Sequence, residues 1–138
     1  AHWSPPHFGV AAELVLADPP LADEPLRNAG PVAHRVVLVE RGKVPLAEKA
    51  LHAQRAGALA VVIADDGRCD ALDQYCVPGS DKARGDGFAK LDNPRHWRRV
   101  HVPVVLVLAE DAAAILSTFN LSTGYLEDDA TTTTTTPE

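Results

Sequence analysis

Three short apolar runs stand out against an otherwise polar chain. They lie at residues 34–40 (HRVVLVE), 58–64 (ALAVVIA) and 102–108 (VPVVLVL), and all three are rich in aliphatic residues. Runs of this length are shorter than a typical helix, and their β-branched residues favour strands that are buried on both faces. A weaker run at residues 10–17 predicts one further strand. The pattern therefore predicts a sheet with an aliphatic core.

The segment between the first two of these runs has the spacing of a helix. Apolar residues recur at three- and four-residue intervals from Leu46 onward, and Pro45 suits a first helical turn. Gly57 suits the end of the helix, because glycine adopts the left-handed conformation there at little cost. Strand, helix and strand within residues 34–64 predict one right-handed βαβ unit with parallel strands. The expected fold class is α/β.

Polar and proline-rich stretches fill the rest of the chain. Residues 18–31 predict a loop, and residues 65–99 form a long polar insertion. Three smaller elements are expected, namely a short helix within 90–98 with Pro94 at its first position, an alanine-rich helix at 110–117 and a last edge strand at 123–127. The expected organisation is an irregular segment at 1–9, one domain at 10–127 and a disordered threonine-rich tail at 128–138.

The acidic composition narrows the classes of partner. A net charge of -6 argues against nucleic acid, because phosphate binding needs a basic surface. No apolar stretch reaches the length of a membrane span, so we expect no direct membrane insertion. The chain begins abruptly at Ala1-His2-Trp3, and we interpret it as a fragment of a larger protein.

Two local features point to the secretory pathway. Cys69 and Cys76 lie close together in a polar loop, where they are able to close a small disulfide loop. Two free thiols are the alternative. Asn120-Leu121-Ser122 is an N-glycosylation sequon, which has meaning only in a secreted or lumenal protein. Together these features predict a secreted or lumenal glycoprotein.

The order of motifs around the predicted helix resembles the protease-associated (PA) domain family. Residues 36–64 read VVLVERGKVPLAEKALHAQRAGALAVVIA, an apolar strand followed by Arg-Gly, a helix with Glu-Lys, an Ala-Gly-Ala exit and a second apolar strand. The later His-x-Pro-Val-Val-Leu-Val strand also matches, and the resemblance extends over roughly residues 10–126. It implies a β-sandwich or open-barrel sheet flanked by short α-helices.

The resemblance also implies a function without catalysis. PA domains accompany proteases, sorting receptors, ubiquitin ligases and glycosidases, where they bind peptides or control access to an active site. The implied partner is a protein, peptide or glycoprotein, or the rest of the parent chain. In family members that bind cargo, the arginine of the Arg-Gly turn helps to hold it, which carries over to Arg41 and Gly42. Val44 stands where the family usually has a cysteine, so any disulfide of that cysteine is absent.

A cationic cluster supplies further candidate ligand-binding residues. Arg95, Trp97 and Arg98 lie within five residues, and arginine forks bind carboxylates while tryptophan offers a flat stacking surface. A patch for carboxylates or glycans is one interpretation. The other is that Trp97 seals the loop against the core, with its arginines in solvent, and we favour this for Trp97.

Two alternative functions remain open from the residues. The acidic residues of the insertion lack EF-hand spacing, but in a calcium-dependent adhesion module they would be the ligands, namely Asp65, Asp66, Asp70 and Asp73. A small hydrolase with a loop-borne nucleophile would use Ser80 with His96 and Asp86, or Cys76 with His96, although no nucleophile elbow is present. No nucleotide motif and no zinc motif occurs, so we expect no cofactor and no resident metal.

Overall fold

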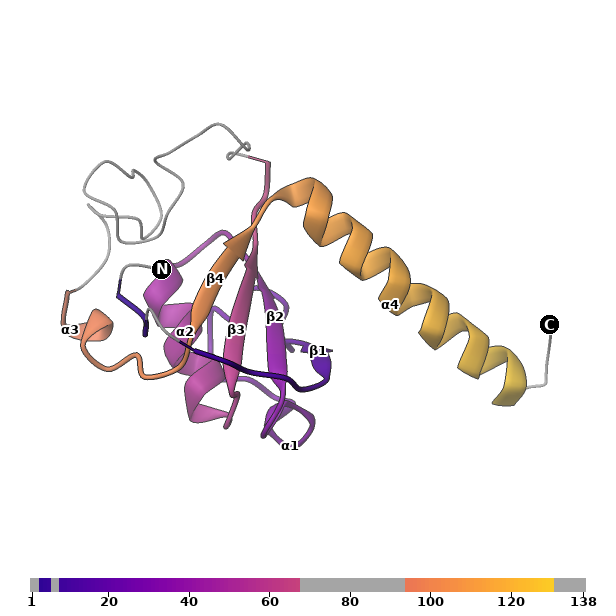
Figure 1. The fold of residues 1–138 in the computed structure, drawn as a ribbon, viewed down its shortest axis with the longest axis horizontal. Helices are drawn as coiled ribbons and strands as arrows, with labels where there is room; N and C mark the ends of the chain where they lie inside the picture. The colour runs from indigo at the N-terminus through magenta and orange to yellow at the C-terminus, as the bar shows by residue number, and fades with distance from the viewer. Residues whose placement is uncertain (1–2, 6–7, 68–93, 131–138) are drawn as a thin grey trace. The chain divides into compact units, whose positions relative to one another are not determined.

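The computed structural model describes residues 3–5, 8–67 and 94–130 (Figure 1). Four strands and four helices follow one another within these residues. They are β1 (Leu14–Leu16), α1 (Ala29–Val32), β2 (Val36–Glu40), α2 (Leu46–Arg55), β3 (Ala60–Ala64), α3 (Pro94–Trp97), β4 (Val104–Val107) and α4 (Ala109–Ala130).

The strands form one four-stranded sheet in the order β1-β2-β3-β4, and every pair of neighbours is parallel. The predicted α/β class and the parallel pairing of the strands on either side of α2 are therefore confirmed. The strands that the three strong apolar runs predicted are present and one to two residues shorter at their ends. Within the described residues this sheet is the whole β-structure apart from one isolated bridge in a turn, so the sandwich or open barrel remains a prediction.

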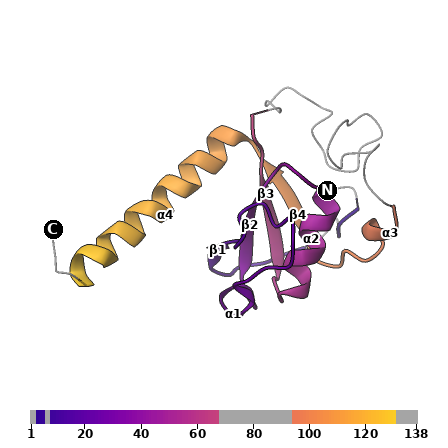
Figure 2. The same cartoon turned by 180° about the vertical axis from the view of Figure 1, so that it is seen from behind.

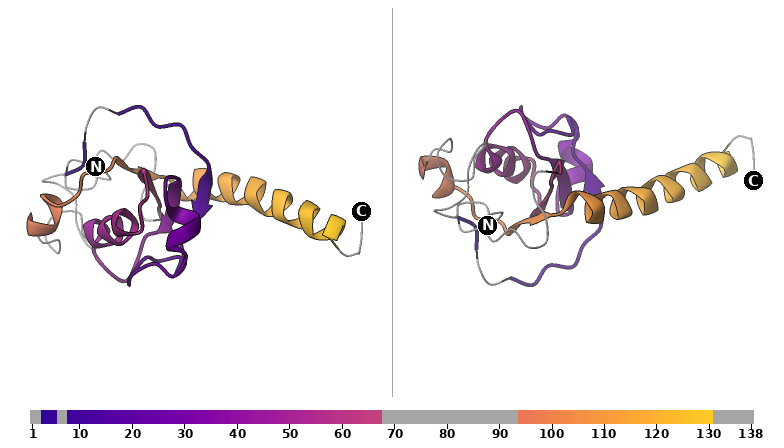
Figure 3. Two further views of the ribbon diagram at one scale, coloured as in Figure 1. Left: turned by 90° about the horizontal axis from the view of Figure 1, so that it is seen from below. Right: turned by 90° about the horizontal axis from the view of Figure 1, so that it is seen from above.

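Helix α2 ends where its sequence predicts and begins one residue after Pro45, which the sequence placed in the first turn. Pro45 is the N-cap residue, one position before the helix, and Glu48 lies in the first turn. Gly57 follows the C-cap with φ +93°, a conformation that costs an L-residue roughly 1–2 kcal/mol. The helix covers one face of the sheet, as Figure 3 shows from both ends. Buried residues of α2 meet the alternate strand residues that point to this side, namely Val37, Val39, Val61, Ile63 and Val104.

The face of the sheet away from α2 is also apolar. One row of register partners crosses all four strands there, consisting of Leu16, Leu38, Val62 and Val105. The chain before β1 passes over this side of the sheet in Figures 1 and 2, but residues 8–13 are themselves exposed. Parallel sheets are normally covered on both faces, so this second apolar face matches the usual pattern.

Two expectations about local structure were wrong. Residues 29–32 form the single-turn helix α1 inside the expected loop, although Pro31 lies within it. Residues 123–127 belong to α4 and not to an edge strand, and α4 runs well beyond the expected 110–117 helix to Ala130. No proline interrupts the chain between Pro103 and Pro137, and one glycine inside a helix, here Gly124, costs only about 1 kcal/mol. Helix α4 forms a structural unit of its own.

The conformation of Gly57 leads to a prediction about stability. A Cβ atom at this position would lie 3.3 Å from both Cα and Cβ of Ala33, in addition to the unfavourable φ. Gly57→Ala should therefore destabilise the chain by about 1–3 kcal/mol in urea unfolding. Gly30→Ala is the matched control, because Gly30 lies in α1 with open space around it and alanine favours helix. Equal destabilisation by both substitutions would contradict this account of Gly57.

Candidate functional site

The Arg-Gly turn directly after β2 has an unusual backbone. Gly42 has φ +126° and Lys43 has φ +73°, so two consecutive residues occupy the region that favours glycine. The Val44 N–H donates to the Gly42 carbonyl at 2.9 Å, which closes a three-residue γ-turn with Lys43 at its centre. Such a turn is rare because of its strain, and surrounding contacts have to hold it.

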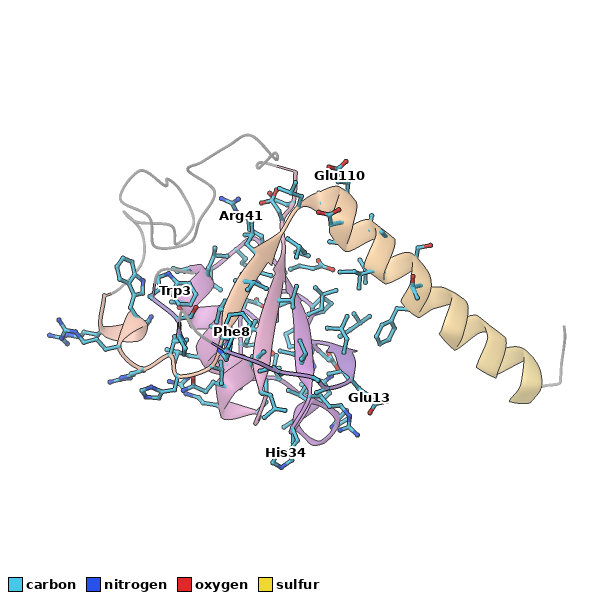
Figure 4. The ribbon with its side chains drawn as sticks, in the orientation of Figure 1. Trp3, Phe8, Glu13, His34, Arg41 and Glu110 are labelled. Atoms are coloured by element: carbon cyan, nitrogen blue, oxygen red, sulfur yellow. The ribbon has the colours of Figure 1, made fainter. Side chains whose placement is uncertain are left out.

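The side chain of Arg41 holds one end of this turn inside the protein. Its Nη1 lies 2.6 Å from Oδ1 of Asp65, and the two side chains are 4% and 0% exposed. The other carboxylate oxygen of Asp65 accepts the Gly67 N–H at 2.9 Å. Arg41 and Asp65 are the residues that follow β2 and β3, and Figure 4 shows Arg41 where these strands end. The carboxylate that Arg41 binds thus belongs to its own chain.

A buried lysine holds the other side of the turn. Lys49 of α2 is fully buried, and its Nζ donates to the carbonyl of Gly42 at 2.6 Å and to that of Leu21. The second bond ties the turn to the loop between β1 and α1. The same loop is joined to β2 by the Glu40 N–H, which donates to the Pro20 carbonyl at 2.8 Å. We call residues 41–44 the RG turn from here on.

The tip of the RG turn presents a cation to solvent. The Lys43 side chain is 66% exposed, and its Nζ lies 2.8 Å from Oδ2 of Asp23, which is 10% exposed. The hydrogen bond from Lys43 lowers the pKa of the Asp23 carboxyl below its ordinary value, and the same bond raises the pKa of the Lys43 ammonium. An ammonium has three donors, so Lys43 retains hydrogen-bonding capacity for another acceptor.

These two pKa shifts predict a pH window for the ion pair. A lowered carboxyl pKa stabilises the fold above the ordinary value of about 4, and this contribution is lost as pH falls through the lowered pKa. A raised lysine pKa stabilises the fold below about pH 10, and this contribution is lost as pH rises through the raised pKa. We expect Lys43→Gln to lower the Tm slightly at neutral pH and not in strong acid. A difference in Tm that persists in strong acid would contradict this assignment.

The segment that contains α3 forms a second cluster, around the last turn of α2. Trp97 packs against the hydrophobic core, as the sealing interpretation predicted, while Arg95 and Arg98 are exposed. Gln54 clamps the chain that follows α3, because its amide donates to the Arg99 carbonyl at 2.8 Å and accepts the His101 N–H at 2.7 Å. Arg41 and Gly42 instead meet Lys49, in the first half of α2, so the candidate residues fall into two groups.

Both edges of the sheet are partly occupied by other residues. At the outer edge of β1, the Asn28 side chain donates to the Leu16 carbonyl at 2.8 Å and accepts the Asp18 N–H at 3.1 Å. At β4, the Ser4 hydroxyl donates to the Val104 carbonyl at 3.3 Å. A strand added by a partner would compete with these bonds, because it uses the same outward-facing groups.

Several sequence predictions fall wholly or partly outside the described residues. Those that lie outside are the disulfide of Cys69 and Cys76, the residues Asp70, Asp73, Ser80 and Asp86, and the tail from residue 131 onward. Asn120 lies in α4, where the structure describes only the backbone. His96 lies in α3, and its buried Nδ1 has no hydrogen-bond partner among the residues that the structure describes.

The described residues contain no group of three or more histidine, cysteine or acidic side chains that could hold a metal ion. Both carboxylate oxygens of Asp65 already accept hydrogen bonds, from Arg41 and from the Gly67 N–H, so a calcium ion would have to compete with these bonds. In the same part of the chain, no helix combines the length and the apolar character that crossing a membrane requires.

The site residues predicted from the sequence do not include Lys43, Lys49 or Asp23. Lys49 had a signal, since it lies three residues after Leu46 and four before Ala53, on the apolar face of the helix. A lysine at such a position is buried unless its stem reaches the surface, and a buried ammonium needs acceptors. The contact of Asp23 could not be predicted, because nothing in the sequence of a polar loop shows which of its acidic side chains contacts the RG turn.

Comparison with known proteins relates the chain to a protein family and to a curated protein. The sequence model of the PA domain matches residues 10–115, which is more than half of the chain. A PRADC1-like protein of Drosophila melanogaster is 42% identical over 52 residues, which are 38% of this chain and 26% of that protein. The match thus spans about a quarter of the length of this curated relative.

Proposed function

Because the chain belongs to the PA domain family, we propose that it is a non-catalytic interaction module of a larger protein of the secretory pathway. Its partner is a peptide or glycoprotein segment, or a surface of its own parent protein. In the second case the domain controls the access of other molecules to that surface. The RG turn is the surface that meets this partner.

One observation carries the proposal, namely that buried charged groups are used to hold a strained surface turn. Arg41, Lys49 and Asp65 are all at least nine-tenths buried, and together they fix the residues on both sides of Gly42. Burying charges is costly, and a strained turn persists only when its surroundings determine it. Such strain clusters at binding sites, where a rigid surface loses little entropy when a partner binds.

The geometry divides the roles within the turn. Arg41 is a positioning residue, because direct contact with a partner would require breaking its ion pair with Asp65. Lys43 is the residue that contacts the partner, since its ammonium is exposed at the tip. An extended segment with an aspartate or glutamate fits this tip, and the backbone N–H and carbonyl of Lys43 offer main-chain hydrogen bonds beside the ammonium.

Two exposed arginines, one in α3 and one directly after it, supply a second surface for the same class of partner. Arg95 and Arg98 turn outward while Trp97 anchors the helix to the core. Their guanidinium groups suit carboxylates of a peptide or of an acidic glycan. Such a cationic patch on a chain of net charge -6 favours short acidic segments over long polyanions.

The apolar face of the sheet away from α2 supports the sandwich or open barrel that the family resemblance implies. Leu38 is buried on this face, while its register partners Leu16 and Val62 are only partly buried. A second layer would complete their burial, since apolar sheet faces are covered in stable domains.

Secretion predicts two covalent features that mass spectrometry detects. Protein purified from culture medium should carry a glycan at Asn120 and a disulfide between Cys69 and Cys76. PA domains occur in proteins of the secretory pathway, which supports this localisation. Two free thiols together with an unmodified Asn120 would contradict it.

An NMR titration tests the proposed function. A pool of short peptides with one to three aspartates should shift the backbone amides of the RG turn in the isotope-labelled chain. Lys43→Glu should abolish this shift. Arg27→Glu is the matched control, because Arg27 is a comparably exposed cation in an exposed ion pair, at 61% against 66%. Amides of residues 42–44 that no acidic peptide shifts would overturn the proposal.

A further inference from the structure

A small pocket lies beside the last turn of α2, at the opposite end of this helix from the RG turn. Its volume is about 100 Å³. The loop before α1 and the start of α1 form one wall, and α2 with the residue after it forms the other. The residues that line it are Pro25, Leu26, Ala29, His52, Arg55 and Ala56.

The size of the pocket limits what it holds. Sites for cofactors and drug-sized ligands enclose roughly 300–1,000 Å³, so this pocket is too small for them. A water molecule takes about 30 Å³ of liquid, so the pocket has room for a few waters or for one short side chain. The expected occupant is therefore a single chemical group of a larger partner.

The polar groups of the pocket select an anion. Arg55 is exposed and has no ion pair within the described residues, and no acidic residue lines the pocket. His52 Nδ1 lies 2.8 Å from the Ala22 carbonyl, which only accepts, so this nitrogen carries a proton. The other nitrogen, Nε2, has no partner among the described residues. The remaining walls are proline, leucine and alanine.

We propose that this pocket binds an alkyl carboxylate of a partner peptide, either an acidic side chain or a free C-terminus. The carboxylate forms a charge-assisted, two-point contact with the Arg55 guanidinium. Its alkyl stem packs against Pro25 and Leu26. The His52 imidazole donates a further hydrogen bond from Nε2 when it is protonated, so binding depends first on Arg55. This site is separate from the RG turn and does not rest on its role.

Arg55 also complements the dipole of α2, because it lies in the last turn of this helix. A purely structural role would make Arg55 matter for stability and leave carboxylate binding unaffected. The test therefore needs a binding measurement beside a stability measurement.

NMR titration of the chain with propionate provides this test, with propionamide as the uncharged molecule of the same shape. Propionate should shift the signals of Leu26, His52 and Arg55, and propionamide should not. Arg55→Gln should raise the Kd for propionate at least about tenfold, since hydrogen bonds to charged groups are among the strongest. Arg99→Gln removes an exposed arginine that does not line the pocket and should leave the Kd unchanged.

Two peptides distinguish the sources of the carboxylate. One is blocked at both ends and carries a single central glutamate, and the other has no acidic side chain but a free C-terminus. Tighter binding of either one identifies the source. His52→Asn keeps a donor toward Ala22 and should weaken binding less than Arg55→Gln. A propionate Kd that Arg55→Gln leaves unchanged, or no binding of propionate at all, would overturn the proposal.

Discussion

Replacing Asp65 with alanine should destabilise the chain by about 3–5 kcal/mol, because it leaves the Arg41 guanidinium buried without its carboxylate. Domains of this size have total stabilities of only about 5–15 kcal/mol, so the loss is a large part of the whole. The substitution also removes the acceptor of the Gly67 N–H. Urea unfolding followed by circular dichroism measures the change as a lower midpoint at unchanged slope.

A double substitution separates the free-energy cost of an unpaired buried charge from the cost of lost packing. Arg41→Met together with Asp65→Leu removes both charges and retains apolar volume, so it should be much less destabilising than Asp65→Ala alone. The difference between these two variants measures the cost of one unpaired buried charge. If Asp65→Ala lowered the free energy of unfolding by less than about 1 kcal/mol, the ion pair of Arg41 and Asp65 would behave like an exposed one, which would contradict its burial.

Lys49→Met should be the second most damaging substitution. Methionine fills the space of the lysine stem, but the Leu21 carbonyl loses its Lys49 donor and the Gly42 carbonyl retains only the Val44 N–H. A carbonyl that loses its partner away from water costs about 1–3 kcal/mol. Because these carbonyls belong to the loop before α1 and to the RG turn, amide hydrogen exchange should accelerate in both segments.

Lys43→Met is the matched control for Lys49→Met. Lys43 lies six residues earlier and is exposed, so its replacement should change stability by less than about 0.5 kcal/mol. The two variants therefore distinguish Lys49, which stabilises the RG turn, from Lys43, which the turn exposes to solvent. Similar losses of stability in both would contradict this division.

The strands and the central helix could be predicted from the sequence because their signals are local. The run from Val36 to Glu40 and the run from Ala60 to Ala64 are apolar and short, and Gly57 ends the helix between them. The length of α4 could not be predicted from its sequence, because Gly124 locally disfavours a helix interior and yet the helix tolerates it.

The candidate site was predictable only in part, because its contacts depend on strand register. Arg41 and Asp65 meet because they follow Glu40 and Ala64, which are partners in the β2–β3 pairing. Both strands are apolar apart from Glu40 at the end of β2, so their sequences do not fix this register. The family resemblance drew attention to Arg41, but whether its side chain turns inward or outward depends on Asp65, 24 positions later.

Charge reversal at the tip of the RG turn is the most direct test of the central claim, which is that Lys43 contacts an acidic partner segment. The measurement is the Kd of one acidic peptide and of its counterpart with lysine in place of aspartate, for the parent chain and for Lys43→Glu. The parent chain should prefer the acidic peptide, and Lys43→Glu should prefer the basic one. Unchanged preference in Lys43→Glu would contradict it and would remove the RG turn from the binding surface.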